Sequence, residues 1–313
     1  MSAAGGDSNV IVVGPIYADT IFAGLERLPE PGEEVFAGEV GWAPGGYAIS
    51  ALAFHRLGVR MRLCGEVGDD MYGRAVLDAL QAEGIDTDFV YRDPAMPTNI
   101  AVTLNWTGDR GIVSYDRMHT APLAWYASAL EGAAPGSLLY LSARHPLAGQ
   151  LAREARQRGI EVAISLSWQP AFLRSWQLRD LLPAADMLFC NVPEALMVTQ
   201  ESTVEAAGER LAGTVREVVI TRGPEGADLY HDGGRETVAA LPVVLVDATG
   251  AGDVFASTYV ATRLWGLRPI DRLRAATWAA AQAIGHIGGG SAAVSGDALR
   301  DAIERLGRAG SNA

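Results

Sequence analysis

Short apolar runs alternate with segments of helical periodicity along most of the chain, and this alternation limits the possible folds more than any other feature. Strands are predicted at 10–13, 61–65, 138–141, 162–166, 187–190 and 218–221, with helices at 48–57, 71–83, 147–158 and 203–211. A helix between two strands returns the chain to the same edge of a sheet, so that the strands run parallel. The pattern therefore predicts an α/β fold, in which a mainly parallel sheet has helices on both faces.

Two stretches interrupt this rhythm. Residues 18–40 are rich in Pro, Gly and Glu, and residues 99–115 alternate between apolar and polar side chains around a Thr107-Gly108-Asp109 turn. Both are typical of antiparallel ribbons rather than of β-α-β units. We therefore expect one domain over 1–313, with a small β lid contributed by about 18–40 and 98–116. The C-terminal part is predicted to be helical at 270–287 and again at 298–306, after a Ser295 cap.

Composition excludes several classes of protein. The chain has 313 residues and a net charge of −12, which disfavours a nucleic-acid partner, since such proteins need a basic face. No apolar run is long enough to span a bilayer, and the first residues lack a secretion signal, so we expect a cytoplasmic protein without a membrane partner. All 25 basic residues are Arg, which excludes any mechanism that depends on Lys. Cys64 and Cys190 are expected to be buried, reduced thiols.

The run Val246-Asp247-Ala248-Thr249-Gly250-Ala251-Gly252-Asp253 carries the strongest chemical signal. The apolar stretch 241–245 before it predicts a strand, and the apolar pattern after it predicts a helix. Small residues let a ligand approach the backbone, and the first N–H groups of a helix have no internal partner. Such a turn attracts anions. An anion cradle beside the Asp253 carboxylate is suited to the transfer of a phosphoryl group to an alcohol.

Five motifs in the same order resemble the PfkB family of carbohydrate and nucleoside kinases, also called the ribokinase family. They are Asp247 to Asp253 (D-x-x-G-A-G-D), Gly45-Gly46 before the 48–57 helix, Gly65-Glu66-Val67-Gly68-Asp69-Asp70 followed by Gly73, Asn191-Val192-Pro193-Glu194 (N-x-x-E), and Thr221-Arg222-Gly223 with Gly226-Ala227. The resemblance spans nearly the whole chain. It implies a three-layer α/β/α fold and an ATP-dependent kinase that requires Mg²⁺.

The resemblance implies that Asp253 is the general base and that the amides of Gly250, Ala251 and Gly252 hold the transferred phosphoryl group. The position of Asp253 at a helix start agrees with this role, because it faces the turn where an acceptor hydroxyl would lie. The alternative is an ordinary acidic residue that a helix N-terminus favours.

The resemblance also implies that two carboxylates bind cations, either directly or through water. Glu194, with Asn191, would organise Mg²⁺ through water, and Asp247 would hold a monovalent cation such as K⁺. Each has a structural alternative. Asn191 and Glu194 have the spacing of a capping box, and the Asp247 carboxylate could cap its own turn.

The nucleotide site is implied to contain Asn191, Thr221, Gly223 and Gly226. The glycines would let the backbone contact phosphate or purine. The alternative is a plain hairpin turn between the strand-like segments around Val219 and Leu229.

The acceptor site is implied to contain Asp19, Gly45, Gly46 and Ser50. A carboxylate accepts two hydroxyl hydrogen bonds, which suits Asp19 to a diol. The glycine pair would let the acceptor lie against the backbone. Relatives usually carry Asn where this chain has Ser50, so sugar contacts there are expected to differ.

The charge around the acceptor favours a substrate without phosphate. Tyr47 stands where kinases of phosphorylated sugars often carry Lys, and the chain has no Lys elsewhere. Arg117 and Arg144 are the residues that could replace that Lys.

The sequence thus predicts a kinase that phosphorylates a primary hydroxyl of a free sugar or of a ribonucleoside. Pairing of the lids of two subunits would cover their strand edges, so a homodimer is expected. A catalytically silent, ligand-binding homologue is the alternative from another class. A Rossmann dehydrogenase is disfavoured, because Gly14-Pro15-Ile16 after the first strand does not form a G-x-G-x-x-G motif.

Overall fold

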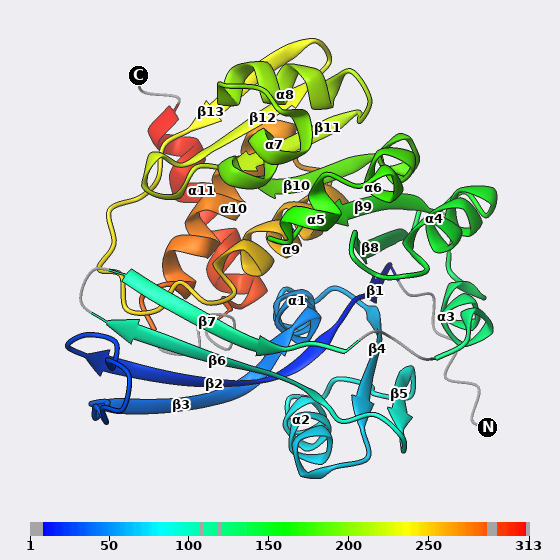
Figure 1. Ribbon diagram of the computed structural model, residues 1–313. Coiled ribbons are helices and arrows are strands. Elements are labelled where there is room, and N and C mark those ends of the chain that lie inside the picture. Colours follow the sequence, from blue (N-terminus) through cyan, green and yellow to red (C-terminus); the bar gives the residue numbers. More distant parts are fainter. Residues whose placement is uncertain (1–8, 107–108, 118–120, 135, 287–292, 311–313) are drawn as a thin grey trace.

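The computed structural model describes residues 9–106, 109–117, 121–134, 136–286 and 293–310, and its centre is a nine-stranded sheet (Figure 1). In spatial order the strands are β13 (Gly234–Val238), β12 (Ala227–His231), β11 (Glu217–Thr221), β10 (Met187–Asn191), β9 (Glu161–Ser165), β8 (Leu138–Ser142), β1 (Val10–Val13), β4 (Met61–Gly68) and β5 (Val90–Asp93). The pairs from β11 to β5 are parallel, and β12 and β13 add an antiparallel edge. The predicted α/β class and mainly parallel sheet are confirmed.

Helices cover both faces of this sheet (Figure 1). They are α1 (Tyr47–Arg56), α2 (Met71–Ala82), α3 (Leu123–Leu130), α4 (Ala148–Gln157), α5 (Pro170–Leu173), α6 (Trp176–Leu181), α7 (Val192–Thr199), α8 (Val204–Ala212), α9 (Ala251–Leu264), α10 (Pro269–Ala283) and α11 (Gly296–Gly310), with 3₁₀ turns η1 (Leu182–Ala184) and η2 (Gly223–Glu225). Within the described ranges, no helix combines the length and the apolar character needed to cross a membrane.

Two large hydrophobic cores, one on each face of the sheet, result from this layering. On strand β1, Val10 and Val12 point to the core under α1, α9 and α10, while Ile11 and Val13 point to the core under α3, α4 and α8. This alternation follows from the two-residue period of a strand, and all four side chains are fully buried. Cys64 and Cys190 are buried, free thiols, as expected.

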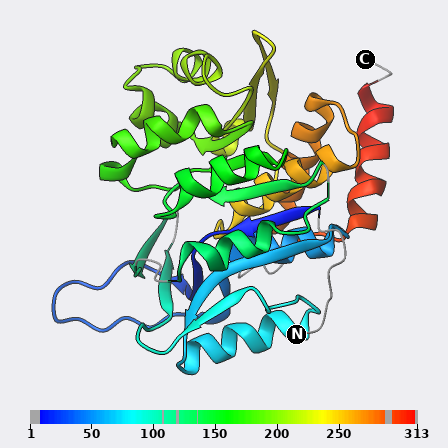
Figure 2. The ribbon, with the colours of Figure 1, turned by 90° about the vertical axis from the view of Figure 1, so that its right-hand side faces the viewer.

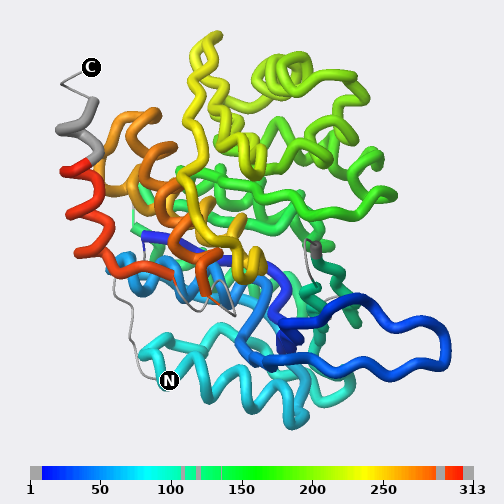
Figure 3. Tube along the Cα trace, turned by 90° about the vertical axis from the view of Figure 1, so that its left-hand side faces the viewer, coloured from blue at the N-terminus to red at the C-terminus, as the bar shows by residue number. Residues whose placement is uncertain are grey.

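A second, smaller sheet protrudes from the body (Figures 2 and 3). It consists of β3 (Glu39–Gly46), β2 (Ile16–Leu25), β6 (Asn99–Trp106) and β7 (Asp109–Tyr115), in that order. The two expected ribbons are the antiparallel pairs β2–β3 and β6–β7, and β2 pairs with β6 in parallel between them. The predicted turn lies partly outside the described residues, at Thr107 and Gly108.

The expected strand at 241–245 is wrong. Residues 239–245 form no strand, and Val244 is 81% exposed. The sheet already ends at β13, so this segment has no neighbouring strand to pair with. It connects β13 to α9, and the Val246 and Asp247 amides both donate to the carbonyl of Ile284. The predicted helix that follows is present as α9.

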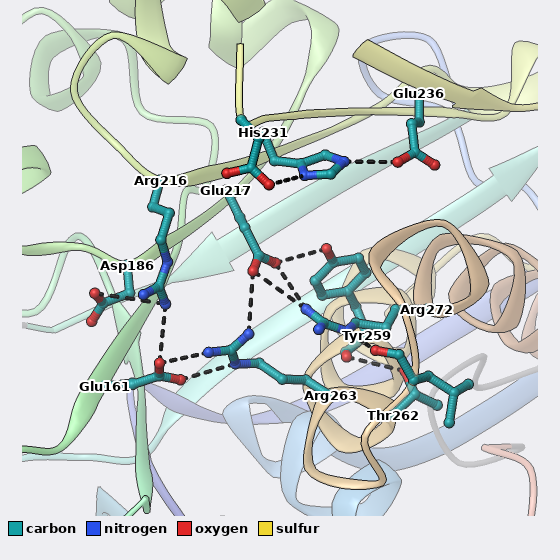
Figure 4. Close-up of polar contacts among 12 residues, drawn as sticks. Glu161, Asp186, Arg216, Glu217, His231, Glu236, Tyr259, Thr262, Arg263 and Arg272 are labelled. Atoms are coloured by element: carbon teal, nitrogen blue, oxygen red, sulfur yellow. Dashed lines mark hydrogen bonds and ion pairs between the residues drawn. The ribbon is translucent and has the colours of Figure 1, made fainter. Parts of the chain in front are cut away.

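The C-terminal end of α9 is anchored by a buried ionic network (Figure 4). Glu217, at the start of β11, accepts hydrogen bonds from Tyr259 Oη (2.8 Å), Arg263 Nη1 (3.2 Å) and Arg272 Nη1 (3.1 Å). The Nε of Arg263 also donates to Glu161 on β9 (2.9 Å). These bonds fix α9 and α10 against the sheet, at the opposite end of α9 from Asp253.

Candidate functional site

Three helix N-termini meet the carboxyl ends of the parallel strands. Helix α7 begins directly after β10, α1 begins where β3 ends at Gly46, and α9 begins at the Gly250 turn. Ligands of open α/β sheets bind at this edge, because the strand ends and the positive helix ends converge there. All the motifs that suggested chemistry in the sequence, except the 65–73 motif, reach this edge.

The N-terminus of α9 has no side-chain cap. Gly250 takes the N-cap position with a φ of 74°, in the left-handed region that favours glycine. Among the described residues, the amides of Gly250 and Gly252 have no hydrogen-bond partner, whereas the Ala251 amide donates to Ala248 O at 3.3 Å. A Cβ added at Gly252 would meet no atom within 4 Å. The helix therefore presents two amides toward open space.

The N-terminus of α7 is different, because its own side chains cap it. Asn191 Oδ1 accepts from the Glu194 amide (2.9 Å), and Glu194 Oε2 accepts from the Asn191 amide (2.9 Å). The capping box that was the structural alternative for these residues is thus present. Glu194 has a second carboxylate oxygen, and burial raises its pKa against the opposing effect of Asn191.

Asp253 occupies the first turn of α9 and is half-buried. Burial raises its pKa from an ordinary 3.8 to about 7, and the charges of Asp19 and Glu194 act in the same direction. A carboxylate that titrates near neutral pH is well matched to the abstraction of a proton.

Asp19 lies in the middle of β2, and only 6% of its surface is exposed. Burial and the nearby charge of Asp247 raise its pKa to about 7. A Cβ on Gly45 would overlap the Asp19 carboxylate, so the first glycine of the pair is required by this contact. The structure thus brings Asp19, Asp247, Asp253 and Glu194 within electrostatic reach of one another.

Gly46 and Ser50 belong to the start of α1. Gly46 has a φ of 59°, and a Cβ there would overlap Pro15 O, so both space and conformation require glycine. The side chain of Ser50, which the sequence predicts in the acceptor site, is fully buried in the structure. Its hydroxyl lies on the side of Asp253.

Asp247 is buried and caps its own turn. Its Oδ1 accepts from the amide and the hydroxyl of Thr249, at 2.9 and 2.7 Å. The turn cap that was the alternative to a cation-binding role for Asp247 is therefore present. Within the described ranges, no three His, Cys, Asp or Glu side chains are grouped as direct ligands of a metal ion.

The segment around Thr221 joins β11 to β12 as a hairpin. Thr221 pairs with Asn191 in the parallel register, which places the two predicted nucleotide residues on adjacent strand ends. Gly223 and Gly226 both have positive φ, and a Cβ on Gly226 would overlap Val238 O. The hairpin geometry alone therefore accounts for Gly226.

The 65–73 motif ties the small sheet to the body. Asp70 accepts hydrogen bonds from the Gly73 amide (2.8 Å), the Thr98 amide (2.8 Å) and the Thr98 hydroxyl (2.7 Å). Thr98 immediately precedes β6, and its hydroxyl also accepts from the Gly68 amide. The motif therefore fixes the position of the residue that precedes β6.

The sequence interpretation missed two groups beside the site. Tyr140, on β8, is fully buried next to Asp253, and a period-two count along 138–142 could have placed it on the same face as Ser142. The second is Asp116, which forms an ion pair with Arg144, and Tyr17 lies against this pair; the sequence suggested another role for Arg144 and gave no indication of Asp116. Tyr17, Asp116 and Arg144 are up to 127 positions apart in the sequence, so no local pattern indicates the contact.

Comparisons with known proteins agree with this geometry. The model of the family described as "pfkB family carbohydrate kinase" matches residues 7–295. A ribokinase of Bacillus subtilis is 28% identical over 303 residues, which cover 95% of this chain and 99% of the relative. Arabidopsis thaliana ribokinase complexed with ribose and ATP superposes with a TM-score of 0.80 at 22% identity, covering 95% of this chain and 99% of that one. A Burkholderia thailandensis nucleoside kinase in complex with inosine gives 0.76 at 21% identity, covering 95% and 97%.

Proposed function

This chain belongs to the pfkB family of carbohydrate kinases, phosphotransferases with an alcohol acceptor, and we propose that it transfers the γ-phosphoryl group of ATP to a primary hydroxyl of a free sugar. The observation that carries this proposal is the uncapped start of α9. Two unpaired amides, Gly250 and Gly252, open toward solvent beside a carboxylate, Asp253, with a pKa of about 7. This space can hold a phosphoryl group against the two amides and an acceptor hydroxyl against the Asp253 carboxylate at the same time.

The proposed chemistry follows from this arrangement. Asp253 takes the proton of the acceptor hydroxyl as that oxygen attacks phosphorus, and the bond to the leaving ADP oxygen breaks. The amides of Gly250 and Gly252, with the positive end of α9, stabilise the charge on the migrating group. Asp19 orients the acceptor through its neighbouring hydroxyls. Asn191, Thr221 and Gly223 are proposed to line the nucleotide site.

The cationic side chains near the small sheet support an acceptor without phosphate. Arg144 is neutralised by Asp116, and Arg117 donates to Tyr115 Oη (2.6 Å) and lies over that ring. Both arginines that could have replaced the missing Lys are thus engaged elsewhere. A phosphorylated sugar would have to break one of these contacts.

Release of ADP from ATP with a panel of acceptors tests the function. Free aldoses, ketoses and cyclitols should support turnover, while their phosphate esters should not. Turnover with ribonucleosides alone would assign the alternative acceptor class, which the aromatic side chains of Trp42 and Tyr115 at the small sheet could accommodate. Tight acceptor binding without ADP release by any candidate would identify a silent, ligand-binding homologue and contradict the proposal.

The pH dependence of kcat/KM should show an acid limb near pH 7. A base must be ionised to accept a proton, so activity should fall as the pH drops through the pKa of Asp253, about 7. Replacement of Asp19 with Asn removes a negative neighbour and should move this limb to lower pH, although acceptor KM will rise. An acid limb near pH 4 in the wild-type enzyme would contradict the assignment.

The residues present fit a divalent cation. Asp19, Asp247, Asp253 and Glu194 lie within electrostatic reach of one another, and repulsion among them adds to the burial that raises the pKa of Asp19 and Asp253, so a cation bound beside them would be stabilised. We propose that Glu194 organises Mg²⁺ through water and that Asp247 holds a monovalent cation. Bound Mg²⁺ would neutralise charge on the nucleotide phosphates.

Replacement of Glu194 with Gln should raise the Mg²⁺ concentration for half-maximal activity by about 10–100-fold, the usual effect of losing an outer-sphere group. Gln retains the oxygen that accepts from the Asn191 amide, so that the capping box is preserved and only the charge is lost. Excess EDTA should abolish wild-type activity. An unchanged Mg²⁺ requirement in Glu194→Gln would show that the side chain serves only as a cap.

We propose that the small sheet acts as a lid over a single kinase domain and pairs with its copy in a homodimer. Both edge strands of this sheet, β3 and β7, carry exposed apolar side chains, among them Val40 (69% exposed) and Val113 (68%). An unpaired edge with apolar groups favours association.

The double replacement Val40→Asp/Val113→Asp should convert a dimer to a monomer. Two charges on the apolar surface oppose association but leave the core of the body intact. Sedimentation equilibrium measures the mass directly. The matched control is Met71→Asp on α2, which is equally exposed (67%) and lies outside the small sheet. A wild-type protein that sediments as a monomer would refute the dimer.

A further inference from the structure

Two buried hydroxyl groups next to Asp253 have no hydrogen-bond partner among the described residues. They are Ser50 Oγ on α1 and Tyr140 Oη on β8, and both residues are 0% exposed. A buried donor without a partner is rare and destabilising, because it has lost its bonds to water without replacement. Each such group therefore requires an explanation.

The Ser50 hydroxyl borders the carboxylate of Asp253, and the Tyr140 hydroxyl lies beside the hydroxyls of Ser50 and Ser165, within electrostatic reach of that carboxylate. The Ser50 hydroxyl is close enough to act as a donor that opposes the upward shift in the pKa of Asp253. Burial raises the pKa of Tyr140, and the charge of Asp253 raises it further. A carboxylate has two oxygens that can each accept two hydrogen bonds, so a rotation of the Asp253 side chain could satisfy both donors.

The Tyr140 ring is held in place from several sides. Its centroid lies 5.4 Å from that of Tyr47, 5.8 Å from that of Phe54 and 6.4 Å from that of Phe189. The hydroxyl at its tip is therefore fixed relative to the sheet. A fixed donor can determine the orientation of a side chain on a neighbouring helix.

We propose that Ser50 and Tyr140 are positioning residues that hold the Asp253 carboxylate, from beneath the site, in the orientation that accepts the acceptor proton. This inference rests on the proposed function, since it assigns a partner to the proposed base. It also gives Ser50 a role that agrees with its complete burial. The other charged or titratable groups that face Asp253 are Asp19 on β2, Glu194 on α7 and Tyr47 on α1.

The test uses Ser50→Ala, Tyr140→Phe and the double variant, each assayed for kcat/KM against pH. Loss of both donors destabilises the ionised form of Asp253, so the acid limb of the double variant should move up by about one pH unit. We expect kcat to fall about tenfold, which is less than the loss in Asp253→Asn, with the KM for ATP unchanged. Ser50→Thr, which retains a hydroxyl, should restore the wild-type limb in part.

Thr258→Val is the matched control. Thr258 Oγ1 is also buried without a partner and lies on α9, but it does not influence Asp253. Its removal should leave the pH profile unchanged. Ser50→Ala, Tyr140→Phe, their double variant and Thr258→Val each remove a buried hydroxyl that has no partner, so their melting temperatures should equal or exceed that of the wild type.

The outcomes separate this inference from the proposed function. If Asp253→Asn is inactive while the double variant has the wild-type pH profile, the positioning role is refuted and the kinase mechanism stands. A lower melting temperature with an unmoved acid limb would assign Ser50 and Tyr140 to packing alone and also refute the role. If Asp253→Asn retains normal turnover, the base assignment itself fails.

Discussion

Replacement of Asp253 with Asn should lower kcat by about 10²–10⁴-fold, the usual contribution of a general base, while ATP affinity is largely kept. Asn has nearly the same shape and retains a helix-start position, but it cannot take a proton. The loss should therefore appear in kcat rather than in the KM for ATP. Steady-state ADP release and nucleotide titration measure the two quantities separately.

The same variant should be more stable than the wild type at alkaline pH. The folded-state pKa of Asp253, about 7, lies above its ordinary value of 3.8, so the folded protein holds this proton more tightly than the unfolded chain. The associated stability is complete below pH 4 and is lost as the pH rises through 7. The melting temperature of Asp253→Asn should thus exceed that of the wild type at pH 8 and approach it at pH 5. Near-normal turnover, or a lower melting temperature at pH 8, would contradict the view of Asp253 as a catalytic base whose pKa is raised by the fold.

The extent of sequence prediction differs between the fold and the site. The six predicted strands and four predicted helices were found because short apolar runs alternate regularly with segments that have the 3.6-residue period of a helix. The segment 241–245 failed because apolar content was its only signal. An exposed apolar run, which includes Val244 here, contains the same residue types as a buried strand, so composition alone cannot distinguish the two.

In the site, motif spacing located the carboxylates, but it could not distinguish their roles. Asn191 and Glu194 satisfy a capping box and also suit a cation, so both interpretations agree with the same bonds. Ser50 illustrates the opposite limit. Its place in a motif suggested contact with a ligand, whereas burial depends on α9, which lies two hundred residues later in the chain. The sequence did not indicate a role for Tyr140, because only the fold brings it within electrostatic reach of Asp253.

The three helix starts at the site also differ in a way that sequence alone does not show. The N-terminus of α7 is closed by the Asn191 and Glu194 side chains, and the Tyr47 amide of α1 donates to Pro15 O (2.9 Å). At the start of α9, the amides of Gly250 and Gly252 have neither a side-chain cap nor a backbone acceptor, and α1, which also lacks a side-chain cap, has its first amide bonded to the chain itself. Unpaired amides at a positive helix end thus lie next to Asp253, where charge would develop during phosphoryl transfer.

Replacement of Gly252 with Val should therefore reduce kcat/KM for ATP by about 10²–10³-fold, the loss expected when amides that stabilise an anion are blocked. The fold should tolerate the change, because Gly252 has an ordinary helical φ and a Cβ there meets no atom within 4 Å. The new side chain would instead fill the space that we assign to the phosphoryl group. Gly149→Val is the matched control, since Gly149 is likewise the second residue of a helix that starts with Ala, α4, and lies on the opposite face of the sheet. Equal activity of the two variants, at equal melting temperatures, would show that no phosphate approaches the start of α9, and the proposed anion site would have to be sought elsewhere.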